Sequence, residues 1–122
     1  SNIIGEYVEG VLKVEIIEEG ILFTYKEEGK WIWLENGDMG DGGKYAGQIE
    51  NGKPNGHGSL IYRNGTRYEG EFKEGHWNGE GTFTFPDGEK WVGEFRKDAP
   101  WNISWYNKVG KIIAKWSDGV KQ

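Results

Sequence analysis

The residues that carry out chemistry in enzymes are few in this chain and poorly placed. It has two histidines, His57 and His76, and no cysteine among 122 residues. No serine and aspartate accompany either histidine in the order of a catalytic triad. Two histidines also fall short of the ligand set of a zinc site. We therefore expect solvated or capping roles for both, and no catalytic residue at either position.

Acidic residues form two adjacent pairs, Glu18-Glu19 and Glu27-Glu28. Neighbours on a strand point to opposite faces, so neither pair can converge on one substrate as an acid/base couple. The stretch GDMGDGG, residues 37–43, offers Asp38 and Asp41 as calcium ligands but lacks the ligand count of a known calcium loop. We expect an irregular connection there, with no metal site and no cofactor.

Basic residues recur at one position of a repeated pattern, just before the first strand of each unit: Lys44, Arg67, Lys90 and Lys111. On an antiparallel sheet they would form a column, two strands or about 9.5 Å apart. Such a column is suited to lipid phosphates or to an acidic partner. The alternative, which we favour, is local pairing with the glutamates of the same face: Glu69, Glu71 and Glu94.

Tryptophans are the other candidate binding residues. Trp77, Trp101 and Trp105 fall in or near expected connections, where an exposed tryptophan often anchors a partner. We expect Trp101 to be exposed and Trp116 to be buried. Residues 31–34, WIWL, are apolar on both sides of a strand. The chain's own N-terminal segment, a second copy or a ligand must therefore cover one side, and we favour the N-terminal segment.

The elements that position these residues repeat every 23 residues. Two full units, 45–67 and 68–90, agree at every glycine. A third, 91–110, is degenerate, with Asp98 and Asn102 at glycine positions. The repeated positions are Tyr45, Gly47, Tyr68, Gly70, Phe72, Gly79, Gly81, Phe83, Phe85, Gly88, Trp91, Gly93 and Phe95.

Each unit is predicted to be a hairpin. In the second unit, a strand at 68–72 leads into a Gly-rich connection at 74–79, then into a strand at 82–85 and an Asp87-Gly88 turn. Alternation places Tyr68 and Phe83 on one aromatic face, which is a candidate binding groove. Gly70 lies between aromatic residues of its strand, and its missing Cβ would leave a floor on which a neighbouring ring can rest.

The pattern Y-x-G-x-F, G-x-x-x-G-x-G, aromatic-x-D/N-G closely resembles the MORN repeat (membrane occupation and recognition nexus). The resemblance implies an all-β, elongated, single-layer antiparallel β-meander of about ten strands, with little or no helix. We expect a single domain over 1–122. Its parts are divergent strands at 1–44, including 11–17 and 21–25 with Glu18–Gly20 between them, then the three units, and a closing strand at 111–122.

Composition sets further limits. The chain contains 21 glycines, 7 tryptophans and a net charge of -5. Ten acidic and three basic residues precede residue 43, whereas four acidic and seven basic residues follow residue 88. This balance argues against nucleic-acid binding, which needs a strongly basic face. No apolar run is long enough for a transmembrane segment. The lack of cysteine and of a signal-peptide pattern favours a cytoplasmic location.

The resemblance implies a non-catalytic protein-protein interaction or scaffolding module, and not an enzyme. The partner would be an unknown protein or a second copy of the chain. One alternative is peripheral, weak binding to acidic phospholipid headgroups. Another comes from residues 27–39, EEGKWIWLENGDM, which resemble one unit of the choline-binding cell-wall repeats. They would favour an aromatic groove for a carbohydrate or a choline-type ligand.

Overall fold

The computed structural model describes residues 2–8, 11–37 and 42–122, with side chains from residue 18 onward. Within these residues, eleven strands form one antiparallel sheet and no helix occurs, which confirms the predicted fold class. The strands are β1 (Asn2–Val8), β2 (Val11–Glu27), β3 (Lys30–Leu34), β4 (Gly43–Glu50), β5 (Lys53–Tyr62), β6 (Arg67–Lys73), β7 (His76–Thr84), β8 (Lys90–Arg96), β9 (Ala99–Tyr106), β10 (Ile112–Ser117) and β11 (Val120–Lys121).

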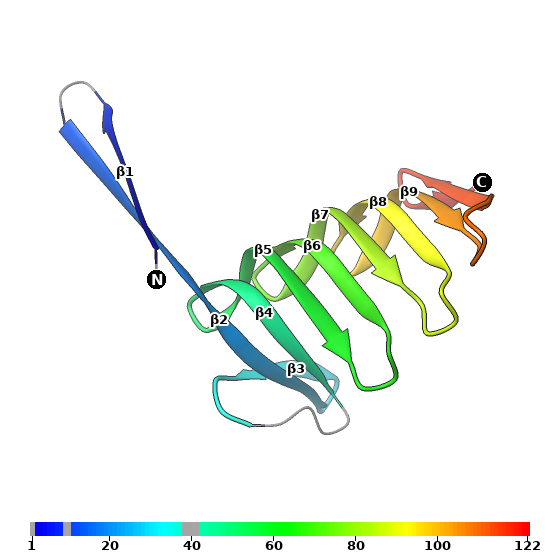
Figure 1. The fold of residues 1–122 in the computed structure, drawn as a ribbon, viewed down its shortest axis with the longest axis horizontal. Helices are drawn as coiled ribbons and strands as arrows, with labels where there is room; N and C mark the ends of the chain where they lie inside the picture. The colour runs from blue at the N-terminus through cyan, green and yellow to red at the C-terminus, as the bar shows by residue number, and fades with distance from the viewer. Residues whose placement is uncertain (1, 9–10, 38–41) are drawn as a thin grey trace.

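From β4 to β11 every strand pairs with the next one along the chain (Figure 1). The N-terminal part departs from this order, because β4 pairs with β2 and not with β3. The hairpin partner of β3 is the last part of β2, residues 23–27. β1 pairs with the first part of β2, and the two form an arm that extends away from the stacked hairpins (Figure 1).

β2 is one continuous strand of 17 residues, so the predicted break at Glu18–Gly20 is wrong. These three residues pair with Ile49, Gln48 and Gly47 of β4. Backbone hydrogen bonding to β4 keeps them extended, since a lone strand edge would otherwise leave their N–H and C=O groups unpaired.

At one edge of the sheet the strands are joined by turns in which both residues have positive φ, as in Glu74 at 50° and Gly75 at 86°. Asn51-Gly52, Lys97-Asp98 and Asp118-Gly119 repeat this geometry, which is that of a two-residue hairpin turn. We call the edge formed by these turns the turn rim. The predicted Gly-rich connection at 74–79 is therefore wrong, because β7 already begins at His76. Gly79 instead occupies a strand position with φ of 111°, against which the Glu71 side chain lies.

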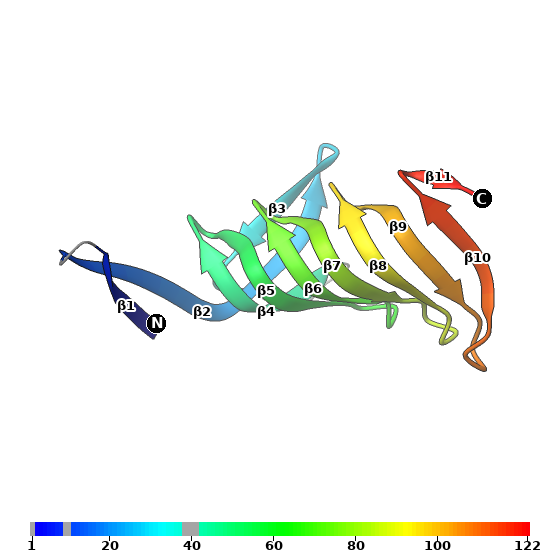
Figure 2. The same ribbon diagram turned by 90° about the horizontal axis from the view of Figure 1, so that it is seen from above.

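One face of the sheet holds the apolar core, and we call it the aromatic face. Its buried members are Leu22, Tyr45, Leu60, Tyr68, Phe72, Phe83, Phe95 and Ile103. The Tyr68 ring meets those of Phe72 and Phe95 edge-on, with ring centroids 5.1 and 5.2 Å apart. The Trp77 ring stacks on Tyr68 at a centroid distance of 5.0 Å. The strands follow one another across a curved sheet (Figure 2). Each unit therefore adds rings next to those of the unit before it.

The tyrosine of each full unit lies flat along its hairpin. The Tyr68 hydroxyl donates a hydrogen bond to the Glu71 carbonyl at 2.9 Å, and Tyr45 does the same to Gln48 at 2.6 Å. A Cβ on Gly81 would lie 2.5 Å from Cζ of Tyr68. The floor beneath the ring is therefore chiefly Gly81, whereas we had predicted Gly70. At Gly70 a Cβ would instead meet the backbone of β7.

The degenerate third unit solves the same packing problem differently. Trp91 stands at the tyrosine position, and Gly93 pairs with Ile103 where the earlier units pair glycine with glycine. Ile103 is 4% exposed and belongs to the apolar core. Trp91 has no counterpart of the tyrosine hydroxyl, and its Nε1 is buried without a hydrogen-bond partner.

Candidate binding surface on the aromatic face

β3 lies over the aromatic face and directs its tryptophans toward it. The ring centroids of Trp31 and Tyr62 are 5.9 Å apart, and those of Trp33 and Tyr45 are 6.3 Å apart. The sheet itself, and not the N-terminal segment that we favoured, thus packs against the tryptophan side of β3, where Trp31 is still 38% exposed. The opposite side of β3 carries Leu34, which is 40% exposed.

Two clefts lined by described residues open on this face. The first, which we call the β3 cleft, has a volume of about 120 Å³ and is lined by Trp31, Trp33, Leu60, Tyr62, Gly75, Trp77 and Asp98. The second, the Thr66 cleft, has a volume of about 530 Å³ and is lined by Gly42, Tyr62, Arg63, Asn64, Thr66, Trp77 and Phe83. Tyr62 and Trp77 belong to both linings, so the two clefts are adjacent.

Asp98 brings a carboxylate to the β3 cleft from the turn rim. Its Oδ1 accepts the backbone N–H of Trp77 at 2.8 Å, and its Oδ2 lies 2.7 Å from Nδ1 of His76. Burial, and secondly the negative charge of Asp98, raise the pKa of the Tyr62 hydroxyl. The phenol therefore stays protonated and available as a hydrogen-bond donor.

The candidate residues of the predicted groove differ in exposure. Tyr68 has no exposed surface and Phe83 is 9% exposed, so Tyr68 supports the face from below and cannot itself contact a partner. Trp77 belongs to β7 and packs between Tyr68 and Phe83, with one side on both clefts. It is therefore a half-buried residue of the aromatic face, whereas we had expected an exposed position in a connection.

Three of the four residues of the predicted basic column form a row across the sheet. Lys44 and Arg67 flank Ile61, while Arg67 and Lys90 flank Thr84. All four members, Lys111 included, are exposed, and none makes an ion pair with a described residue. The local pairing with glutamates that we favoured is not found: Glu94 instead pairs with Arg96 at 3.3 Å.

The tryptophans near the C-terminus are covered by cations of the same chain. The Arg96 guanidinium lies 4.2 Å from the Trp101 ring, and the Lys121 ammonium lies 5.5 Å from Trp105 and 5.7 Å from Trp116. Trp105 also donates its indole N–H to Glu89 at 3.0 Å. Trp101 and Trp116 are both half-buried, so the predicted contrast between them is not evident in their exposure.

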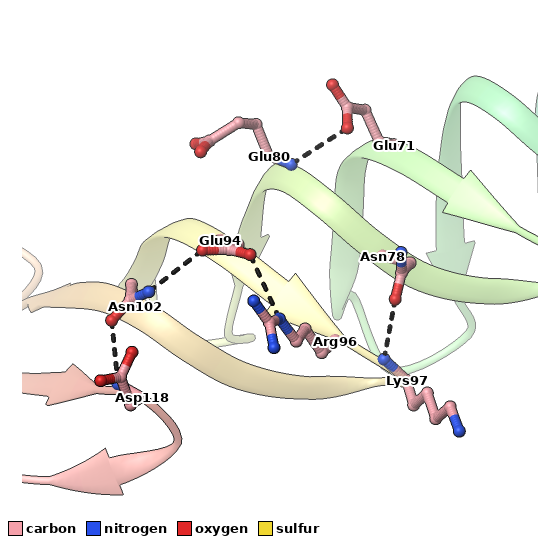
Figure 3. Close-up of polar contacts among 8 residues, drawn as sticks. All are labelled: Glu71, Asn78, Glu80, Glu94, Arg96, Lys97, Asn102 and Asp118. Atoms are coloured by element: carbon pink, nitrogen blue, oxygen red, sulfur yellow. Dashed lines mark hydrogen bonds and ion pairs between the residues drawn. The ribbon is translucent and has the colours of Figure 1, made fainter.

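Side-chain hydrogen bonds join each unit to the next along the turn rim (Figure 3). Oδ1 of Asn78 accepts the N–H of Lys97 at 3.4 Å, and Oδ1 of Asn102 accepts that of Asp118 at 2.9 Å. Asn102 also donates a hydrogen bond from Nδ2 to Oε1 of Glu94 at 3.0 Å. This bond lowers the pKa of the Glu94 carboxyl, and Arg96 makes a smaller contribution in the same direction. The departures from glycine at Asp98 and Asn102 therefore tie neighbouring units together.

The remaining sequence candidates do not form a site. His57 is exposed and separate from His76, and no cluster of three metal-ligating residues occurs in residues 18–37 and 42–122. Asp38 and Asp41 lie outside the described residues. Among the described residues, no helix is long and apolar enough to cross a membrane.

Sequence reasoning did not anticipate that Trp31, Trp33, Tyr62 and Asp98 would meet. The 23-residue step contained part of the signal, since Asp98 follows Gly75 by one repeat and stacking places each rim turn beside the previous unit. The approach of β3 had no such signal, because it depends on β4 pairing with β2.

Comparison with protein-family models matches residues 45–67 and 68–90 to the MORN repeat. These are the two units that agree at every glycine, so the resemblance seen in the motif is confirmed. A search of curated proteins gives no match for the chain.

Proposed function

Because residues 45–67 and 68–90 are MORN repeats, we propose that the chain is a non-catalytic protein-binding module whose contact surface is the aromatic face beside and beneath β3. MORN repeats are modules often used in interactions with proteins or with membrane lipids. The chain offers a scaffold for such contacts, because its hairpins are joined both by backbone pairing and by side-chain bonds along the turn rim.

The junction of the two clefts at Tyr62 and Trp77 carries this proposal. Half-buried aromatic rings form its floor, while Arg63, Asn64 and Thr66 form a polar border at the Thr66 cleft. Aromatic anchors surrounded by polar groups are typical of protein interfaces. The Thr66 cleft, at about 530 Å³, can accept a bulky side chain of an extended peptide.

Acidic phospholipid is the second candidate, and the basic column favours it because its members have no acidic partner among the described residues. Only charges close to the bilayer contribute, at about 1 kcal/mol each. With the net charge of -5, four such residues are a weak basis for membrane binding.

Selection from a random-peptide display library, followed by affinity measurement on two variants, tests the proposed function. Thr66→Arg fills the Thr66 cleft, whereas Thr82→Arg places the same side chain on the opposite face, since Thr82 alternates with Phe83. We expect selected peptides to bind wild type and Thr82→Arg equally and Thr66→Arg at least about tenfold more weakly. Equal binding to both variants, or no selected peptide, would contradict the proposal.

A further inference from the structure

The β3 cleft has the composition of a site for a methylated ammonium group. Four aromatic side chains line it, two from β3, one from β5 and one from β7: Trp31, Trp33, Tyr62 and Trp77. Among the described residues of its lining, Asp98 is the only one with a charge. Resting on the proposed function, we propose that this cleft binds the trimethylated side chain of a lysine in the partner protein.

The size of the cleft restricts the ligand to the end of a side chain. Its volume of about 120 Å³ is well below the roughly 300–1,000 Å³ of pockets that enclose drug-sized ligands. The cleft is bounded by β3 on one side and by β5 and β7 on the other. A ligand must therefore reach it on a slender stem, as the methylenes of a lysine side chain allow.

The aromatic lining favours a cation over a neutral group of the same shape. The faces of indole and phenol rings carry negative electrostatic potential and attract cations within about 6 Å of the ring centroid. Trp31 already shows this behaviour, because the Lys26 ammonium lies 5.7 Å from its ring. Lys26 is not part of the lining, so it leaves the cleft open. Asp98 adds a carboxylate to the lining from the turn rim.

The hydrogen bonding of the cleft favours methylation. A primary ammonium brings three N–H donors, each of which needs an acceptor when it is desolvated. Each carboxylate oxygen of Asp98 already accepts one hydrogen bond, from the Trp77 N–H and from His76, so few lone pairs remain for three further donors. A trimethylammonium group keeps the positive charge and has no donor to satisfy. Its methyl groups also bury against the rings.

A choline headgroup carries the same trimethylammonium group, and the shape of the site favours the lysine. β3 lies over the aromatic face and forms one wall of the cleft. A flat bilayer surface would meet β3 before its headgroups could enter the cleft. A peptide can lie along the adjacent Thr66 cleft while one side chain enters the β3 cleft, because the two clefts share Tyr62 and Trp77.

Calorimetric titration of the full chain with small probes tests the site. The probes are acetyl-trimethyllysine methylamide, the unmethylated lysine compound, a neutral analogue with a tert-butyl group in place of trimethylammonium, and phosphocholine. We expect the trimethyllysine probe to bind at least about tenfold more tightly than the lysine and neutral probes. Equal binding of the charged and neutral probes would overturn the cation site. Tighter binding of phosphocholine would overturn the assignment to lysine.

Two variants with matched controls locate the binding. Asp98→Asn keeps an oxygen for the Trp77 N–H but removes the charge, and Asp87→Asn makes the same change at an exposed turn remote from the cleft. Trp31→Leu removes a lining ring, and Trp101→Leu removes one that is absent from the lining. We expect about tenfold weaker binding of the trimethyllysine probe in each cleft variant and no change in either control. Unchanged binding in both cleft variants would place the probe elsewhere.

The indole N–H resonances of the wild-type chain give a readout that needs no variant. We expect the probe to shift the signals of Trp31, Trp33 and Trp77 and to leave that of Trp101 unchanged, and shifts confined to other tryptophans would overturn the proposal. Failure of this inference differs from failure of the proposed function. Display-selected peptides that bind through the Thr66 cleft, with no response to the trimethyllysine probe, would remove the methylammonium site alone.

Discussion

Gly70 and Gly81 face each other across β6 and β7 so closely that a Cβ on Gly70 would lie 2.5 Å from the Cα of Gly81. Gly70 also has φ of 154°, which L residues rarely adopt. Its neighbour Glu69 is exposed on the opposite face. The same strand therefore contains one position that excludes a side chain and one that accepts any.

Gly70→Val should destabilise the protein much more than Glu69→Val, despite the better strand propensity of valine. We expect a loss of roughly 2–4 kcal/mol for Gly70→Val, from backbone strain and overpacking. Glu69→Val should change stability by about 0.5 kcal/mol or less. Chemical denaturation measures both, and equal midpoints would remove the packing explanation for the glycine.

Asn102→Ala should loosen the C-terminal hairpin. The Asn102 side chain donates a hydrogen bond to Glu94 and accepts one from the N–H of Asp118. Gly119, which follows Asp118, donates its N–H to the Trp101 carbonyl at 2.9 Å. We expect a loss of about 0.5–1.5 kcal/mol and faster amide exchange at Gly119. Asn36→Ala, at an exposed residue, is the control. Unchanged exchange at Gly119 would show that the hairpin does not depend on Asn102.

Alkaline pH should unfold the protein through its buried phenols. Burial raises the pKa of Tyr45, Tyr62 and Tyr68, while an unfolded tyrosine titrates near about 10. The stabilisation linked to these groups is thus complete below pH ~10 and is lost as the pH rises above that value. In an absorbance titration, these three of the six tyrosines should ionise only together with unfolding. Ionisation of all six before the chain unfolds would be inconsistent with burial.

Liposomes with phosphatidylserine or phosphoinositides should not bind strongly at physiological salt. The basic column is exposed, but its members stand about two strands apart and charges beyond ~8 Å are largely screened there. Co-sedimentation is the measurement, with Arg67→Glu/Lys90→Glu as the matched variant. Robust binding that this variant abolishes would make lipid the leading function.

The sequence by itself determined the repeated unit. The 23-residue step of glycines and aromatic residues specified the hairpins, and alternation assigned Tyr68, Phe72 and Phe83 to one apolar face, as the structure confirms. These features are local, because the period of two along a strand and the shape of a tight turn follow from a few neighbouring residues. The predicted strand boundaries were less accurate. Glycine usually marks a loop, whereas Gly79 lies within strand β7.

Only the tertiary structure decided how the ends meet the repeats. The pairing of β4 with β2 leaves β3 free to lie over the aromatic face, and no local pattern in residues 30–34 distinguishes this from a place within the meander. The β3 cleft likewise needs Trp31, Tyr62 and Asp98 from three separate elements. Contacts between such distant residues depend on strand pairing across the whole sheet, and therefore the candidate site emerged only once the chain was folded.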